Sequence, residues 1–115
     1  MIEVTFFRKK KRFSGFEIKG HSHFYDKWVN KMIRAMGIRQ KDYICSAVSA
    51  VAYMAVIGLK KVGKKKVKYK TGHSGFMLCC LDQDPDSKTD LLFETLRMSL
   101  VEIDKEYPGN IRIHY

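Results

Sequence analysis

Apolar and polar side chains alternate along the first twenty residues, which is the period of a half-buried β-strand. Residues 2–8 and 13–19 follow this alternation, and the charged segment Lys9–Arg12 separates them. Two such runs with a short polar connection predict an antiparallel hairpin. We therefore expect two paired strands first, with His21 just beyond the second.

Helical spacing of apolar residues predicts three helices after this hairpin. The first is an amphipathic helix within residues 24–40, with an apolar stripe that ends near Gly37. The second opens at Asp42, a favourable N-cap residue, and carries small apolar side chains up to Gly63. The third starts after an N-cap at Asp86 or Ser87, in a capping box spanning Ser87–Asp90, and stops before Pro108.

A second hairpin and a last strand complete the predicted elements. Residues 65–71 and 76–81 bracket a Gly-His-Ser-Gly turn, and residues 110–114 could return as a strand. This order predicts an α+β fold, in which two long helices pack on a mostly antiparallel sheet and residues 24–40 form an inserted amphipathic helix. A chain of 115 residues has room for one core, so we expect a single domain, 1–115.

The longest apolar run expected to form one segment is 50–59, which is shorter than a membrane span and is flanked by charge. The first residues resemble a strand and lack the apolar region and cleavage site of a leader. These features predict a soluble chain with cytoplasmic localisation and no membrane partner.

The formal net charge of +10 comes largely from lysine-rich turns and one strand. The runs concerned are Lys9–Arg12, Lys60–Lys61 and Lys64–Lys70. Such runs indicate either a solvated basic surface or attraction to a polyanion such as a nucleic acid, and both interpretations stand.

Three cysteines fit neither a disulfide framework nor a zinc ribbon, so reduced thiols are expected. Cys79 and Cys80 alternate along a predicted strand, and we expect both to be packing residues. Cys45 falls in the first turn of the second predicted helix, where unpaired N–H groups and the helix dipole favour a thiolate. A free cysteine in a helix is more commonly a small buried hydrophobic residue.

Histidine supplies a possible base for this thiol. Imidazole beside a thiol makes a Cys/His dyad, as nucleophilic catalysis requires. Gly-His-Ser occurs twice, at Gly20-His21-Ser22 and again at residues 72–74, so the dipeptide Gly-His is a weak signal. His21, His23 and Cys45 could instead bind zinc, but no fourth ligand has suitable spacing. We therefore expect no metal and no cofactor.

Several segments together resemble the ribosomal-processing cysteine protease family usually called Prp. They are Gly20-His21-Ser22, the run Asp42–Ser49, the helix end Gly58-Leu59, and Tyr107-Pro108 with Ile111-Arg112-Ile113. The resemblance covers nearly the whole chain, and the motif Asp-x-x-Cys-x-Ala-Val-Ser is its most specific part. It implies a small homodimeric protease that removes the N-terminal extension of large-subunit ribosomal protein L-twenty-seven. It also implies that His21 and Cys45 are catalytic, because only His21 precedes the cysteine motif as the family's histidine does.

The chain departs from the family pattern between these two residues. His23 stands where the family has a glycine, and residues 24–40 lengthen a connection that is short and glycine-rich in the family. Since both dyad residues remain, the insertion bears on substrate choice and loop closure more than on the chemistry.

The implied reaction assigns roles to the residues around the dyad. Cys45 attacks the scissile carbonyl, and His21 stabilises the thiolate and then protonates the leaving amine. Backbone N–H groups at the helix start, that of Cys45 included, are placed for an oxyanion. The supporting residues expected are Gly20 (room for substrate), Ser22 (part of the motif), Asp42 (N-cap, or orientation of His21) and Ser49 (a structural hydrogen bond).

A non-catalytic function is the alternative to the protease. A basic ribosome-assembly domain would bind ribosomal RNA through the lysine runs 9–12 and 64–70. Such a domain needs no reactive thiol.

Overall fold

One five-stranded sheet forms the base of the fold. The computed structural model describes residues 1–20 and 40–115, with side chains for all of these except 40–42 and 74. The strand order is β3-β4-β2-β1-β5, and only the pair β1–β5 is parallel. The predicted α+β fold with a mostly antiparallel sheet is therefore confirmed. The strands are β1 (Ile2–Lys9), β2 (Arg12–Lys19), β3 (Val67–Thr71), β4 (Met77–Leu81) and β5 (Ile111–His114).

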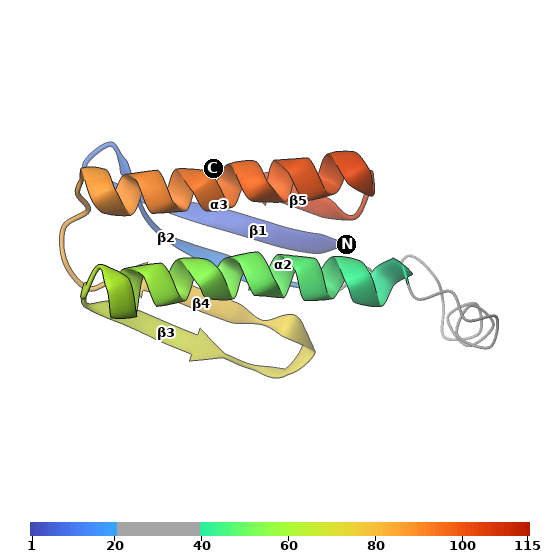
Figure 1. Cartoon of the computed structure of the whole chain (residues 1–115), viewed down its shortest axis with the longest axis horizontal. Helices are drawn as coiled ribbons and strands as arrows, with labels where there is room; N and C mark the ends of the chain where they lie inside the picture. The colour runs from blue at the N-terminus through green and yellow to red at the C-terminus, as the bar shows by residue number, and fades with distance from the viewer. Residues whose placement is uncertain (21–39) are drawn as a thin grey trace.

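Two long helices lie side by side across one face of this sheet (Figure 1). Helix α2 (Gln40–Ile57) continues into a π-helical turn, η1 (Gly58–Val62), and helix α3 (Ser87–Glu106) follows β4. A short 3₁₀ turn, η2 (His73–Gly75), joins β3 to β4 as the predicted hairpin requires. The inserted helix predicted within residues 24–40 falls, apart from its last residue, outside the described residues.

The β1–β2 hairpin closes more tightly than the sequence predicted. Only Lys10 and Lys11 form the loop, with φ angles of 53° and 66°. Positive φ at both central residues matches the right-handed twist of the flanking strands. The register shifts between Phe7, which pairs with Gly15, and Arg8, which pairs with Phe13, so Ser14 on β2 is the extra residue of a bulge.

The core lies between the sheet and the two helices. Alternate residues of β1 and β2 point toward the helices, as the sequence pattern predicted. Phe16 on β2 and Phe93 on α3 are both fully buried, and their rings meet edge to face with centroids 6.3 Å apart. The other buried hydrophobic residues of the strands are Ile2, Val4, Phe6, Phe13, Ile18, Cys79 and Ile111.

Helix α2 with η1 is a longer apolar segment than residues 50–59. The segment Tyr43–Val62 has a mean hydropathy of 1.6, enough by length and composition to cross a membrane. In this fold one stripe of the segment is buried in the core. The stripe consists of Ile44, Val48, Ala52, Ala55, Val56 and Leu59. The apolar residues of α2 thus build a core helix of this fold. A core helix can meet the same criteria of length and hydropathy as a membrane-spanning helix.

A capping box starts α3 at Asp86, one of the two N-cap residues that the sequence predicted. The N-cap is Asp86, whose Oδ1 accepts the Thr89 N–H at 2.9 Å, while Thr89 Oγ1 accepts the Asp86 N–H at 2.9 Å. The predicted box at Ser87–Asp90 is therefore wrong, because a threonine hydroxyl closes it instead of an acidic side chain. Asp90 accepts the Phe13 N–H at 2.9 Å and so ties α3 to β2.

Acid titration of Asp86 should reveal how this cap stabilises the fold. The ammonium of Lys65, 2.6 Å away, and then the Thr89 N–H lower the pKa of Asp86 to about 2. An unfolded aspartate has a pKa of about 3.9, so this stabilisation is present above that pH and is lost as pH falls through about 2. Asp86→Asn keeps an N-cap but cannot titrate. Chemical denaturation should show the native chain losing stability relative to the variant in that window, and parallel curves would contradict the assignment.

Candidate active site

Cys45 lies in the second turn of α2 and not in the first. Gln40 is already helical, so Asp42 is inside the helix and the predicted N-cap at Asp42 is wrong. Gln and Lys favour helix more than Asp does, which explains why the helix includes residues 40 and 41. At this depth the Cys45 N–H belongs to the helix's own hydrogen-bond ladder. The oxyanion and first-turn dipole arguments for Cys45 therefore do not hold, since both effects belong to the first turn.

The side chain of Cys45 is half-buried and packs against the core cluster. Its neighbour Ile44 is fully buried, and Ser49, one turn later, is exposed. The thiol is thus at the border between the core and the surface of α2. A side chain in this position is held by packing and can still be reached from outside.

Gly20 ends β2 in a conformation that suits glycine. Its φ is +89°, and a Cβ at this position would lie 2.5 Å from the carbonyl oxygen of Met1. The backbone itself therefore requires glycine here, and the room for substrate that the sequence interpretation gave to Gly20 stays a prediction. The positive φ of Gly20 lets the backbone turn at the end of β2.

The fold brings the end of β2 and the start of α2 to the same end of the molecule (Figure 1). Lys19 pairs with Glu3 at the start of β1, beside the N-terminus. His21 and Ser22 lie outside the described residues, as does the side chain of Asp42. The roles of His21, Ser22, Asp42 and Ser49 around Cys45 consequently stay predictions.

The other two thiols are poor nucleophiles. Burial first, and then the neighbouring Cys80, raises the pKa of Cys79 to about 11. Burial and the Glu17 carboxylate likewise raise the pKa of Cys80. Both groups are therefore held as thiols near neutral pH, which agrees with the packing role that the sequence predicted.

Metal ligands do not gather in the described part of the chain. Among residues 1–20 and 40–115, no three His, Cys, Asp or Glu side chains are placed to hold a metal ion. Two of the three residues considered for zinc, His21 and His23, lie outside that part.

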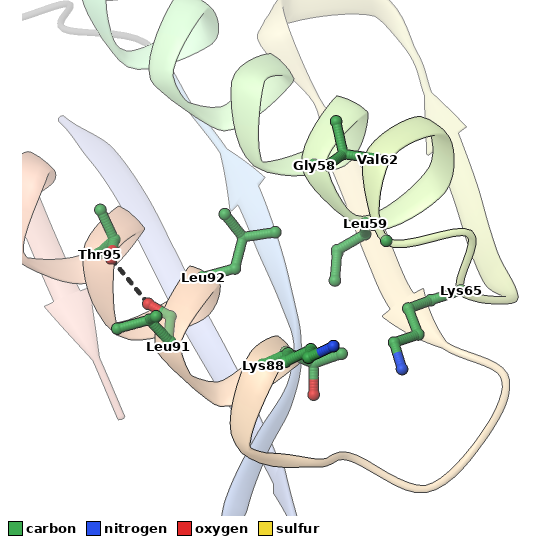
Figure 2. Close-up of a pocket in the computed structure, with 10 residues that line it drawn as sticks. Gly58, Leu59, Val62, Lys65, Lys88, Leu91, Leu92 and Thr95 are labelled. Carbon is green, nitrogen blue, oxygen red and sulfur yellow. Dashed lines mark hydrogen bonds between the residues drawn. The ribbon is translucent and has the colours of Figure 1, made fainter.

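A groove of about 470 Å³ lies between η1 and the start of α3 (Figure 2). Leu59 and Leu92 point into it, and Lys65 and Lys88 lie at its border. At 1.5 Å per residue, its wall at Gly58 is about 20 Å along the helix axis from Cys45, so the groove is separate from the thiol. Sequence reasoning missed it because its two walls are far apart in the chain.

Comparison with known proteins identifies one family. The family model for cysteine protease Prp matches residues 1–112. No curated protein sequence matches the chain significantly.

Three solved structures share the fold over nearly the whole chain. Two are of the S. aureus ribosomal processing protease Prp, each covering 100% of this chain and 99% of that one. The complex with a covalently linked product peptide has a TM-score of 0.76 at 20% identity. The complex with a substrate peptide has a TM-score of 0.77 at 19% identity. SMU.848 from Streptococcus mutans has a TM-score of 0.73 at 23% identity, with 99% and 92% covered.

Proposed function

The chain belongs to the cysteine protease Prp family, and from this premise we propose that it is a ribosomal-processing endopeptidase with Cys45 as nucleophile. Its substrate is the N-terminal extension of ribosomal protein L-twenty-seven, and His21 is the second member of the dyad. The family match over residues 1–112 is the observation that carries this proposal.

The three thiols of the chain support the choice of Cys45. Cys79 is fully buried, and the pKa values of Cys79 and Cys80 are raised. Cys45 is half-buried on α2, within the Asp-x-x-Cys-x-Ala-Val-Ser motif of the resemblance. It is therefore the thiol that combines accessibility with the motif.

The proposed reaction has two halves. The Cys45 Sγ attacks the carbonyl carbon of the scissile bond, the C–N bond breaks, and the His21 imidazolium gives its proton to the leaving amine. A thioester links the acyl half to Cys45. Water then attacks this thioester while His21 takes its proton; the C–S bond breaks, which releases the acid and restores the Cys45 thiolate beside the His21 imidazolium.

The surrounding residues position this dyad in the proposal. Gly20 turns the backbone at the end of β2 toward His21, and Ser22 follows within the same motif. Asp42 belongs to the first turn of α2, and its role in the proposal is to orient His21. Ser49 lies one turn after Cys45 on the same helix, and its exposed hydroxyl is available for a local hydrogen bond.

A peptide substrate and a second copy of the chain are the partners we infer. The S. aureus relative was solved with substrate and product peptides, which supports an extended peptide as the ligand. We further infer a homodimer in the cytoplasm, with one domain, 1–115, per copy, without metal, cofactor or membrane partner. The net charge of +10 supports a weak attraction to ribosomal RNA beside the protease activity.

Mass spectrometry of the host's L-twenty-seven with its native N-terminus tests the substrate. We expect a single cut near that N-terminus and none in L-twenty-seven that begins after the extension. The control is the same incubation with heat-denatured protein. An intact precursor, incubated with folded protein whose Cys45 still reacts with iodoacetamide, would reject this substrate and leave the protease assignment in place.

A further inference from the structure

Within residues 1–20 and 40–115, every residue other than glycine that has a positive φ angle is a lysine. The φ angles are 53° at Lys10, 66° at Lys11 and 52° at Lys64. A side chain disfavours this region because its Cβ crowds the backbone, whereas glycine or asparagine adopts it at lower cost. For a two-residue hairpin loop of this kind, Asn-Gly is the common choice. Two successive lysines there work against stability, and such strain at the surface points to a function.

The fold brings these lysine turns to one end of the molecule (Figure 1). In the connection from β4 to α3, Asp84 lies 3.1 Å from Lys9 Nζ and 2.7 Å from Lys10 Nζ. Two residues later, Asp86 lies 2.6 Å from Lys65 Nζ. One connection therefore contacts both turns, although they are far apart in the sequence. We name the resulting surface the basic end; it comprises Lys9, Lys10, Lys11, Arg12, Lys60, Lys61, Lys64, Lys65 and Lys66.

Ion pairing does not account for this concentration of charge. The side chains of Lys9, Lys10 and Asp84 are 54%, 67% and 56% exposed, and exposed pairs add little stability. The nine cations also outnumber the four aspartates of residues 82–90. Lys68 and Lys70 are a different case, because β3 is an edge strand and charge there blocks unwanted strand pairing.

We propose that the basic end is a docking surface for the phosphate backbone of RNA. Lysine ammonium groups on flexible stems bind phosphates as point charges and position a protein without reading sequence. Residues 8–12 at the hairpin tip include no apolar side chain, so this tip has nothing to insert into a lipid bilayer. The surface lies at the opposite end of α2 from Cys45 and leaves the thiol accessible. This docking deepens the RNA attraction of the proposed function by assigning it to one surface, and it does not depend on peptide cleavage.

The variant Lys10→Asn/Lys11→Gly tests this docking with two readouts of opposite sign. Affinity for a fluorescein-labelled RNA duplex of about 20 base pairs should fall at least about tenfold at roughly 100 mM KCl, and the salt slope should drop by about two. The thermal unfolding midpoint should rise by roughly 4 °C, because Asn-Gly relieves the strained turn. A purely structural role for the lysines predicts no gain in stability.

Two control variants decide whether the effect is local. Lys10→Arg/Lys11→Arg keeps the charge and should keep the RNA affinity. Lys105→Gln/Arg112→Gln also removes two charges, one from the last turn of α3 and one from β5, at the other end of α3 from the basic end. Its RNA affinity should fall by less than a third of the fall in Lys10→Asn/Lys11→Gly. An equal loss of RNA affinity in the two charge-removing variants would overturn the proposal, because it would mean that RNA is attracted by the net charge of the whole protein. Unchanged affinity in Lys10→Asn/Lys11→Gly, or binding to phosphatidylserine vesicles in place of RNA, would also overturn it.

Discussion

Replacing Cys45 by alanine should reduce the rate of peptide cleavage by at least about 10⁴-fold, the scale on which catalytic nucleophiles act. The proposed thioester cannot form without the Sγ atom. The fold should survive, because the side chain of Cys45 is half-buried and alanine is a good helix former. Timed mass spectrometry of the cleaved extension gives the rate, and circular dichroism checks the fold.

Two comparisons make this result specific to a Cys/His dyad. Cys80→Ala removes a half-buried thiol with a raised pKa and should leave cleavage intact. If His21 and Cys45 act as a unit, the double variant His21→Ala/Cys45→Ala should be no slower than Cys45→Ala alone. A Cys45→Ala protein that still cleaves would remove Cys45 from the mechanism, and additive losses would separate His21 from it.

Replacing Phe93 by alanine should have the largest effect on stability, a loss of about 3–5 kcal/mol in the free energy of unfolding. Phe93 on α3 is fully buried, and its ring meets that of Phe16 on β2 edge to face. The change removes this contact and leaves a cavity between the helix layer and the sheet. Urea denaturation followed by circular dichroism measures the loss.

Leu91→Ala is the matched control for this core contact. Leu91 lies on the same helix but is 69% exposed, so its truncation should change the unfolding free energy by less than about 0.5 kcal/mol. A loss at Phe93 no larger than that at Leu91 would mean that α3 is not anchored to the sheet through the Phe93 ring.

Local periodicity was sufficient to predict most elements of the fold. Alternation marked the first hairpin, and apolar spacing marked α2 and α3, because each signal depends on which face of a strand or helix is buried. The glycine-rich turn between residues 71 and 76 marked the second hairpin. Element ends were less predictable. Helix α2 includes Gln40 and so begins before Asp42, the N-cap that the sequence predicted. The capping box of α3 joins Asp86 to the Thr89 hydroxyl and so begins before the predicted box at Ser87–Asp90.

Contacts between distant segments could not be predicted from periodicity. The pairing of β5 with β1, the groove beside Leu92 and the meeting of the two lysine turns all depend on tertiary packing. For the candidate site, motif spacing singled out Cys45. The raised pKa values of Cys79 and Cys80 come from burial in the folded chain, which a strand pattern alone does not measure.

The parallel pairing of β1 with β5 has a consequence during synthesis. Ile2 lies opposite Ile111, and Val4 lies opposite Ile113. The strand β1 pairs with β2 along one edge, but its other edge lacks a partner until residue 113 has also left the ribosome. Until then β1 presents an unpaired edge. Contacts this distant in sequence form late and slow the folding of a small domain. A nascent chain halted before β5 should therefore be an open sheet, exposed to proteases and to pairing with other strands.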